Sequence, residues 1–189
     1  MNGLTLLENL KAATAGGPAG SDPLTGLDSR ASFLASLRSM TGPRALATVS
    51  LDPVRRGQPR RTGSVVRKMT ARTGALMACE LAAADALGCW DTDLLVATFA
   101  ADRLAEAEES LEGMRARFAE MSFAATRGPP HFGTLTAAIA EWSDPTDTAF
   151  AAALLRARAG LAAAQLRGGD CIITVDTLFG PFLPSLFVA

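Results

Sequence analysis

The chain has 189 residues, a net charge of −1 and 49% apolar residues, which is typical of one globular domain of ordinary size. This composition excludes a disordered tail, a collagen-like chain and a strongly basic nucleic-acid-binding protein. Alanine occurs 37 times, arginine 16 times and lysine twice, whereas tyrosine is absent. A GC-rich genome would account for much of this bias.

Several kinds of site and segment are excluded as well. The single histidine, His131, cannot supply a histidine-based metal site, and the three cysteines lie too far apart for a C-x-x-C pair or a disulfide framework. No run of 18 apolar residues would span a bilayer, and the N-terminus lacks the basic residues that open a secretory signal. We therefore expect a cytoplasmic protein with no membrane span, no bound metal and no cofactor.

The first third of the chain predicts two helices around one strand. Residues 1–20 form an N-terminal segment and linker, which could be a small docking helix or a frayed terminus. A helix is expected over 28–40, with Asp28 or Ser29 as its N-cap. A buried strand over 44–53 and a helix over 64–78 should follow, separated by a basic loop.

The rest of the chain continues the mixture of strands and helices. We expect, in order, strands over 87–90 and 94–99 joined near Asp91-Thr92-Asp93, a helix over 101–121, a pair of strands within 131–142, a helix over 144–169 capped near Thr146 or Asp147, and a strand over 171–176. One α/β (α+β) domain over 21–177 accommodates all of them. An apolar C-terminal tail over 178–189 remains, which packs either on its own domain or on a partner.

The segment Asp22-Pro23-Leu24-Thr25-Gly26-Leu27-Asp28-Ser29-Arg30 resembles the D-x-L-T-G-L-x-N-R signature that opens GGDEF domains. Later landmarks of that family have counterparts at similar distances, so the resemblance covers roughly residues 21–176. It implies a central mixed sheet of about five strands flanked by helices, plus a small hairpin. It also implies the activity of the family, diguanylate cyclases, which join two GTP molecules into cyclic di-GMP.

The resemblance places the family's metal and nucleotide ligands on changed residues. The family's first strand ends in D-x-D-x-F-K, where the first Asp holds Mg²⁺ and the Lys meets phosphate. These positions are Ser50 and Arg55 here, and the second Asp is retained as Asp52. The Asn that reads guanine falls on Gln58, and the Asp that follows it falls on residue 63 or 64.

The signature hairpin and the late helix are changed too. R-x-G-G-D-E-F aligns with residues 88–94, so that the two glycines become Trp90 and Asp91 and the acidic pair becomes Thr92-Asp93. An indole at a position that needs a bare backbone should block a phosphate. The inhibitory R-x-x-D motif falls on residues 81–84 and is absent. The phosphate-binding Lys of the late helix is Gln165.

These changes act together on one reaction. A cyclase needs carboxylate-held metal ions that stabilise the charge developing at the α-phosphate as the 3′-hydroxyl attacks. Simultaneous loss of the first ligand, the glycine turn, the base-reading pair and the phosphate cations indicates a degenerate domain that is not an enzyme.

Three groups of residues leave alternatives open. Asp52, Asp91 and Asp93 could hold a divalent ion or could be solvated caps. Trp90 is either an exposed partner anchor or a residue tucked against the sheet. One stretch contains seven basic residues and no acidic one, and it could bind phosphates, bind an acidic partner or be merely solvated. These residues are Arg55, Arg56, Arg60, Arg61, Arg67, Lys68 and Arg72. The candidate phosphate- or partner-binding residues are Arg55, Arg56, Arg60, Arg61 and Trp90.

We therefore expect a catalytically inactive GGDEF-like domain that serves as a regulatory or protein-interaction module in bacterial signalling, with another protein or a second copy of the chain as partner. The alternative is an effector that binds GTP or cyclic di-GMP in the residual pocket, although the substitutions make nucleotide binding doubtful. An active cyclase is a third, less favoured possibility. A nucleic-acid partner is not expected at this net charge.

Overall fold

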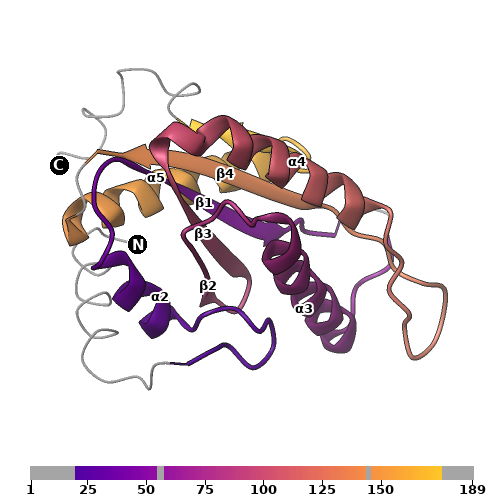
Figure 1. Cartoon of the computed structure of the whole chain (residues 1–189). Coiled ribbons are helices and arrows are strands. Elements are labelled where there is room, and N and C mark those ends of the chain that lie inside the picture. Colours follow the sequence, from indigo (N-terminus) through magenta and orange to yellow (C-terminus); the bar gives the residue numbers. More distant parts are fainter. Residues whose placement is uncertain (1–19, 55–57, 144–145, 176–189) are drawn as a thin grey trace, which may run out of the picture.

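A five-stranded sheet forms the centre of the molecule in the computed structural model, which describes residues 20–54, 58–143 and 146–175 (Figure 1). The strand order is β2-β3-β1-β4-β5, and all neighbours pair antiparallel except β4 and β5, which are parallel. The strands are β1 (Arg44–Leu51), β2 (Ala86–Asp91), β3 (Leu94–Ala100), β4 (Leu135–Trp142) and β5 (Ile172–Thr174). The expected mixed sheet of five strands flanked by helices is confirmed.

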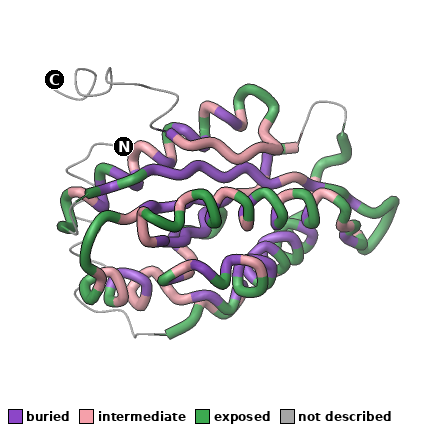
Figure 2. The backbone as a smooth tube through the Cα atoms, turned by 45° about the horizontal axis from the view of Figure 1, so that its top comes forward, coloured by how far each residue is buried: buried purple, intermediate pink, exposed green. Residues whose placement is uncertain are grey.

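Helices cover both faces of this sheet. Helices α3 (Gly63–Glu80) and α4 (Leu104–Ala119) pack on one face, and α2 (Arg30–Leu37) and α5 (Asp147–Leu166) pack on the other. The central strands are consequently buried on both sides, as Figure 2 shows. Burial on both faces explains why the sequence of β1 is an almost continuous apolar run instead of an alternating one.

Three of the helices have a hydroxyl side chain as their N-cap. Ser29, Thr62 and Thr146 each accept a hydrogen bond from a backbone N–H three residues further on, at the starts of α2, α3 and α5. Beyond the end of α5, Gly168 and Gly169 have φ angles of +123° and +66°, which favour glycine. The expected caps at Ser29 and Thr146 and the glycine stop are therefore confirmed.

The opening signature organises the start of the domain. One carboxylate oxygen of Asp22 accepts hydrogen bonds from the backbone N–H groups of Leu24 and Thr25 and from the Thr25 hydroxyl, at 2.7–3.2 Å. Asp28 then pairs with β2, because its N–H donates to Leu87 and its carbonyl accepts from Cys89. The motif is thus a compact turn that joins α2 to the edge of the sheet.

Two expected elements differ in the structure. The region 131–142 contains one strand, β4, and not a pair, because β4 uses β1 as its antiparallel neighbour while His131 forms an isolated bridge with Phe123. The final strand spans 172–174 only. The expected N-terminal segment up to residue 19 and the tail over 178–189 lie outside the described residues. No helix in the described ranges is long and apolar enough to cross a membrane.

Two helical glycines provide a matched test of this packing. A Cβ atom on Gly74 in α3 would lie 2.7 Å from the backbone oxygen of Thr25, whereas a Cβ on Gly113 in α4 would meet nothing within 4 Å. We expect Gly74→Ala to lower the free energy of unfolding by about 1–3 kcal/mol through overpacking. Gly113→Ala should raise it by about 0.5–1 kcal/mol, because alanine favours the helix. Urea unfolding measures both, and equal effects of the two substitutions would contradict this account.

Candidate functional site

The end of β1 and the hairpin between β2 and β3 meet at a small pocket beside α3. Ser50 and Asp93 line this pocket together with Thr70 and Thr73 of α3. The structure therefore brings the expected metal-ligand position and a hairpin carboxylate together. The pocket measures only about 10 Å³, which is room for a single water molecule and not for a nucleotide.

Asp52, two residues beyond Ser50, is a buried carboxylate whose two oxygens are both engaged. Oδ1 accepts a hydrogen bond from the Thr136 hydroxyl at 2.5 Å. Oδ2 accepts from the Thr134 hydroxyl at 2.7 Å and from the backbone N–H of Asp170 at 2.8 Å. Asp52 is 3% exposed, so these bonds replace its hydration. Its carboxylate joins the end of β1 to the start of β4 and to the turn before β5.

The turn after α5 comes very close to this carboxylate. A Cβ atom on Gly169 would lie 2.7 Å from Oδ2 of Asp52, so a side chain at position 169 would displace the buried charge. Gln165, at the position of the family's phosphate-binding Lys, donates from Nε2 to the carbonyl of Leu51 at 3.2 Å. The position that the resemblance assigns to phosphate binding therefore lies next to the end of β1, and its neutral amide bonds to the backbone of the fold.

Trp90 is a core residue: of the two alternatives, a residue tucked against the sheet is confirmed and an exposed partner anchor is wrong. Its side chain is 4% exposed and packs against Phe150 of α5, with ring centroids 5.5 Å apart. The guanidinium carbon of Arg30 lies 4.2 Å from the centre of the indole ring, a cation–π contact. Alternation along β2 directs Trp90 toward α2 and α5, so it fills space beneath the hairpin and is not available to a partner.

The hairpin tip is exposed and negatively charged. Asp91, Thr92 and Asp93 are all exposed, and the N–H of Thr92 donates to the Asp91 carboxylate at 2.8 Å. Burial, followed by the carboxylates of Asp22 and Asp91, raises the pKa of the Cys89 thiol to about 11. These carboxylates thus disfavour a further negative charge next to the tip.

The three carboxylates considered for a divalent ion do not assemble into a site. Asp52 is enclosed and fully hydrogen-bonded, whereas Asp91 and Asp93 are at the exposed tip. No group of three or more His, Cys, Asp or Glu side chains that could hold a metal ion occurs within the described residues.

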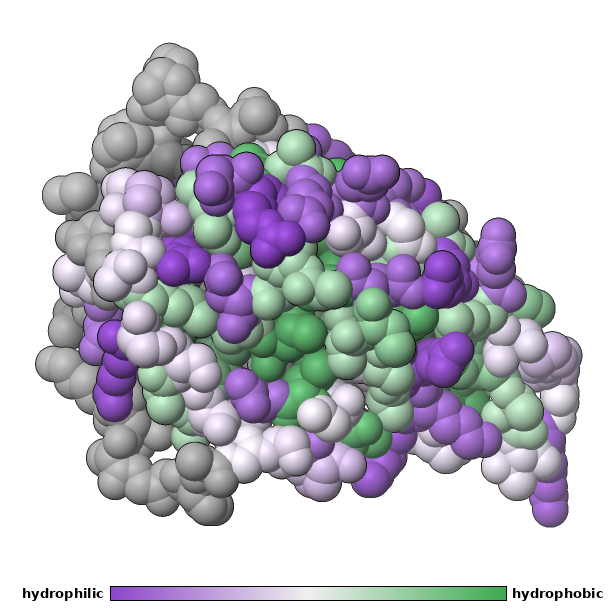
Figure 3. Space-filling view, in the orientation of Figure 1, coloured by the Kyte–Doolittle hydropathy of each residue, from purple (hydrophilic) through white to green (hydrophobic). Residues whose placement is uncertain are grey.

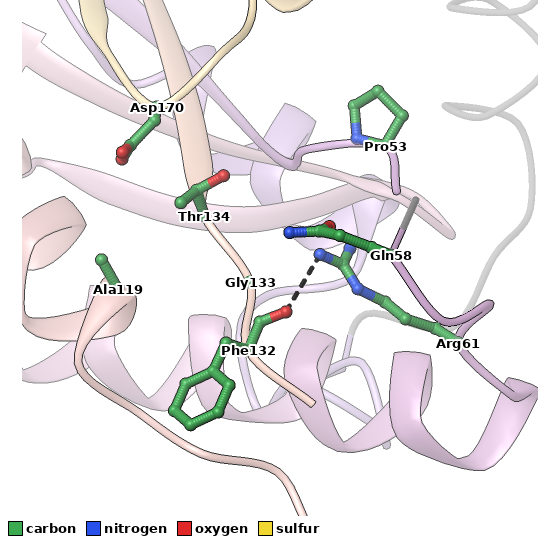
Figure 4. A pocket seen from close by; sticks show the side chains of 8 residues that line it. All are labelled: Pro53, Gln58, Arg61, Ala119, Phe132, Gly133, Thr134 and Asp170. Atoms are coloured by element: carbon green, nitrogen blue, oxygen red, sulfur yellow. Dashed lines mark hydrogen bonds between the residues drawn. The ribbon is translucent and has the colours of Figure 1, made fainter. Parts of the chain in front are cut away.

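A second, larger hollow is lined by Thr134 and Asp170, two hydrogen-bond partners of Asp52, and in it Arg61 and Gln58 face the loop before β4 (Figure 4). Its volume is about 140 Å³. Arg61 donates from Nη1 to the carbonyl of Asp52 at 2.8 Å and from Nη2 to the carbonyl of Phe132 at 3.3 Å. Burial lowers the pKa of Arg61, and the nearby Asp52 carboxylate opposes this effect. Arg61 therefore joins two loops, while Arg60 is exposed to solvent.

Two of the predicted binding residues cannot be placed, and three residues that bind Asp52 were not predicted. Arg55 and Arg56 lie outside the described residues. Reasoning from the sequence missed Thr134, Thr136 and Asp170 as the partners of Asp52. The alternation of two threonines at the start of a strand is a signal for them, because residues i and i+2 share a face.

Comparison with solved structures decides which fold this is. The FimX GGDEF domain from Pseudomonas aeruginosa has a TM-score of 0.66 at 22% identity, covering 82% of this chain and 99% of that one. The GGDEF domain of DgcB from Caulobacter crescentus, solved in complex with c-di-GMP, has a TM-score of 0.67 at 15% identity, covering 86% and 96%. The structure of diguanylate cyclase SiaD from Pseudomonas aeruginosa, in complex with its activator SiaC, has a TM-score of 0.69 at 21% identity. The match covers 90% of this chain and 67% of the SiaD chain.

The fold is that of a GGDEF domain. No protein-family profile matches the sequence, and no curated protein matches it either. The expected resemblance to the GGDEF family is thus confirmed at the level of the fold. Within this GGDEF fold, Ser50, Gln165 and the hairpin lie near one another around the end of β1.

The hydrogen bonds of Asp52 can be tested directly. Asp52→Asn removes the negative charge and places an N–H₂ group where one oxygen accepted hydrogen bonds, so at least one buried partner loses its acceptor. We expect the free energy of unfolding to fall by about 3 kcal/mol. Asp91→Asn at the exposed tip is the control and should change it by less than about 0.5 kcal/mol. Chemical denaturation of both variants gives the comparison, and an unaffected Asp52→Asn protein would contradict the structural role.

Proposed function

We propose that this chain is a catalytically inactive GGDEF-like domain that acts as a regulatory or protein-interaction module in bacterial cyclic di-GMP signalling. The observation that carries the proposal is the use of the former site by the fold itself. The pocket beside Ser50 and Asp93 has room for about one water molecule, Gln165 is bonded to β1, and Trp90 fills the layer beneath the hairpin.

Chemistry supports the same proposal. Attack of a 3′-hydroxyl on an α-phosphate requires metal ions that neutralise developing charge, and these ions need carboxylate ligands. Ser50 offers a neutral hydroxyl at the first ligand position. Of the two carboxylates near it, Asp93 is at the exposed hairpin tip, and Asp52, at the end of the same strand, has both oxygens engaged within the fold. A metal at this place would have to break buried hydrogen bonds before it could assist the reaction.

Two of the structural neighbours support a role in signalling through a partner. SiaD is a diguanylate cyclase in complex with a protein activator, and the DgcB domain is in complex with c-di-GMP. Protein partners and the cyclic dinucleotide therefore both occur with this fold. For the present chain a protein partner is the better supported of the two, because the hollow beside Arg61 measures about 140 Å³, below the several hundred Å³ of sites that enclose a ligand.

The proposal predicts that the purified protein makes no cyclic di-GMP. The protein is incubated with GTP and Mg²⁺ at micromolar concentration, and the products are separated by chromatography and identified by mass spectrometry. An active diguanylate cyclase treated in parallel is the control for the assay. Formation of cyclic di-GMP by the wild-type chain above the level of a heat-denatured sample would overturn the inactive assignment.

The alternative of a nucleotide-binding effector is tested by calorimetry with GTP and with cyclic di-GMP. We expect no saturable heat at ligand concentrations up to several hundred micromolar. Saturable binding that weakens when Arg60 and Arg61 are replaced by alanine would instead establish the effector, and the interaction module would then be one that responds to nucleotide.

A further inference from the structure

Positive charge is concentrated in two parts of the chain that contain no acidic residue. Residues 53–79 include seven arginines and lysines, and residues 121–140 include Arg127, yet neither stretch has an Asp or a Glu. Because the whole chain has a net charge of −1, the remaining residues are net acidic. Such segregation of charge creates a local positive potential, although the net charge of the whole chain is close to zero.

The fold brings the two acid-free stretches together. Lys68 of α3 donates to the carbonyl of Ala124 at 3.1 Å, and Arg72 donates to the sulfur of Met121 at 3.5 Å. Figure 3 shows hydrophilic side chains among apolar ones over α3 and over the loop after α4. We call this surface the basic face and define it by its exposed cations: Arg60, Arg67, Lys68, Arg72 and Arg127.

The cations of the basic face are not neutralised by the protein. In the described part of the chain, Arg60, Arg67 and Arg127 have no ion pair, and the partners of Lys68 and Arg72 are a carbonyl and a thioether. The arginines of α4 and the turn before it differ, because each is paired with a glutamate: Arg103, Arg115 and Arg117. The basic face therefore retains charge for an external acidic group.

An exposed aromatic residue borders this face. The Phe132 side chain is 56% exposed, although most large apolar side chains of the domain are buried. It lines the hollow of about 140 Å³ and also a second hollow of about 100 Å³, in which Pro59 and Pro130 are neighbours. The bond from Arg61 to its carbonyl fixes the backbone at this position. Hollows lined by an exposed aromatic residue suit an apolar side chain of a partner.

We propose that the basic face and Phe132 form a docking surface for an acidic protein segment that carries an apolar side chain. This inference rests on the proposed role as an interaction module and assigns that role a surface that borders the former cyclase site at Gln58. Carboxylates of the segment meet the unpaired cations, and its apolar side chain enters a hollow beside Phe132. A polynucleotide fits less well, because its phosphates would continue onto the net acidic remainder of the molecule.

Fluorescence anisotropy with a synthetic peptide tests the proposal. The probe is a fluorescein-labelled 12-residue peptide with six glutamates around a central Phe-Leu pair, and the matched peptide has glutamine at all six positions. We expect saturable binding of the acidic peptide only, weakening as salt is raised from 50 to 300 mM. The Arg60→Glu/Arg67→Glu protein should bind at least tenfold more weakly, and Phe132→Ala should bind several-fold more weakly.

Arg38→Glu and Arg167→Glu are the control variants, because both residues are exposed but lie directly after α2 and after α5. They should change peptide affinity by less than twofold. Equal weakening by a control and by the basic-face variant, or no binding of the acidic peptide, would overturn the proposal. Preferential binding of a 20-nucleotide single-stranded DNA would also overturn it. A concentration-dependent oligomer that dissociates in the Arg60→Glu/Arg67→Glu variant would overturn it as well, because a second copy of the chain would then occupy the basic face.

These outcomes are separate from those of the proposed function. Synthesis of cyclic di-GMP would overturn the inactive assignment while peptide binding at the basic face remained intact. Absence of peptide binding in a protein that makes no cyclic di-GMP would remove this surface alone.

Discussion

The buried carboxylate of Asp52 is the interaction on which the arrangement of the site depends. A charge removed from water is costly unless hydrogen bonds replace its hydration, and here two hydroxyls and one backbone N–H do so. Those donors come from β4 and from the turn before β5, so satisfying a single side chain fixes three segments. Arg61 adds a fourth segment through the carbonyl of the same residue. The hydrogen bonds of Asp52 therefore hold these four segments together at the polar end of the sheet.

These hydrogen bonds lie within the fold and do not depend on a bound nucleotide. Asp22, Asp28 and Asp52 act within the chain, through turns, a bridge and buried hydrogen bonds. Ser50 and Gln165 stand at positions that the motif alignment assigns to ligand contacts, and the side chain of each donates to the Leu51 carbonyl. Folding constrains the first set whether or not a reaction takes place. Fold and activity can therefore separate in this scaffold.

Local chemistry made much of this structure predictable from the sequence. The caps at Ser29 and Thr146 act over three residues, and the hairpin turn at 91–93 joins adjacent strands, so short-range patterns were sufficient. Contacts between distant residues were not predictable. The strand pairing of 135–142 depends on β1, more than 80 residues away, and the burial of Trp90 depends on α5. The partners of Asp52 are likewise separated from it by 82 to 118 residues.

The bridge from Asp28 to β2 has a consequence for the behaviour of the molecule in a crowded cell. β2 is an outer strand of the sheet, and an outer strand with free N–H and C=O groups invites pairing with strands of other chains. Asp28 uses the carbonyl of Leu87 and the N–H of Cys89, the groups that an invading strand would need there. The opening signature therefore also shields the sheet against edge-to-edge aggregation.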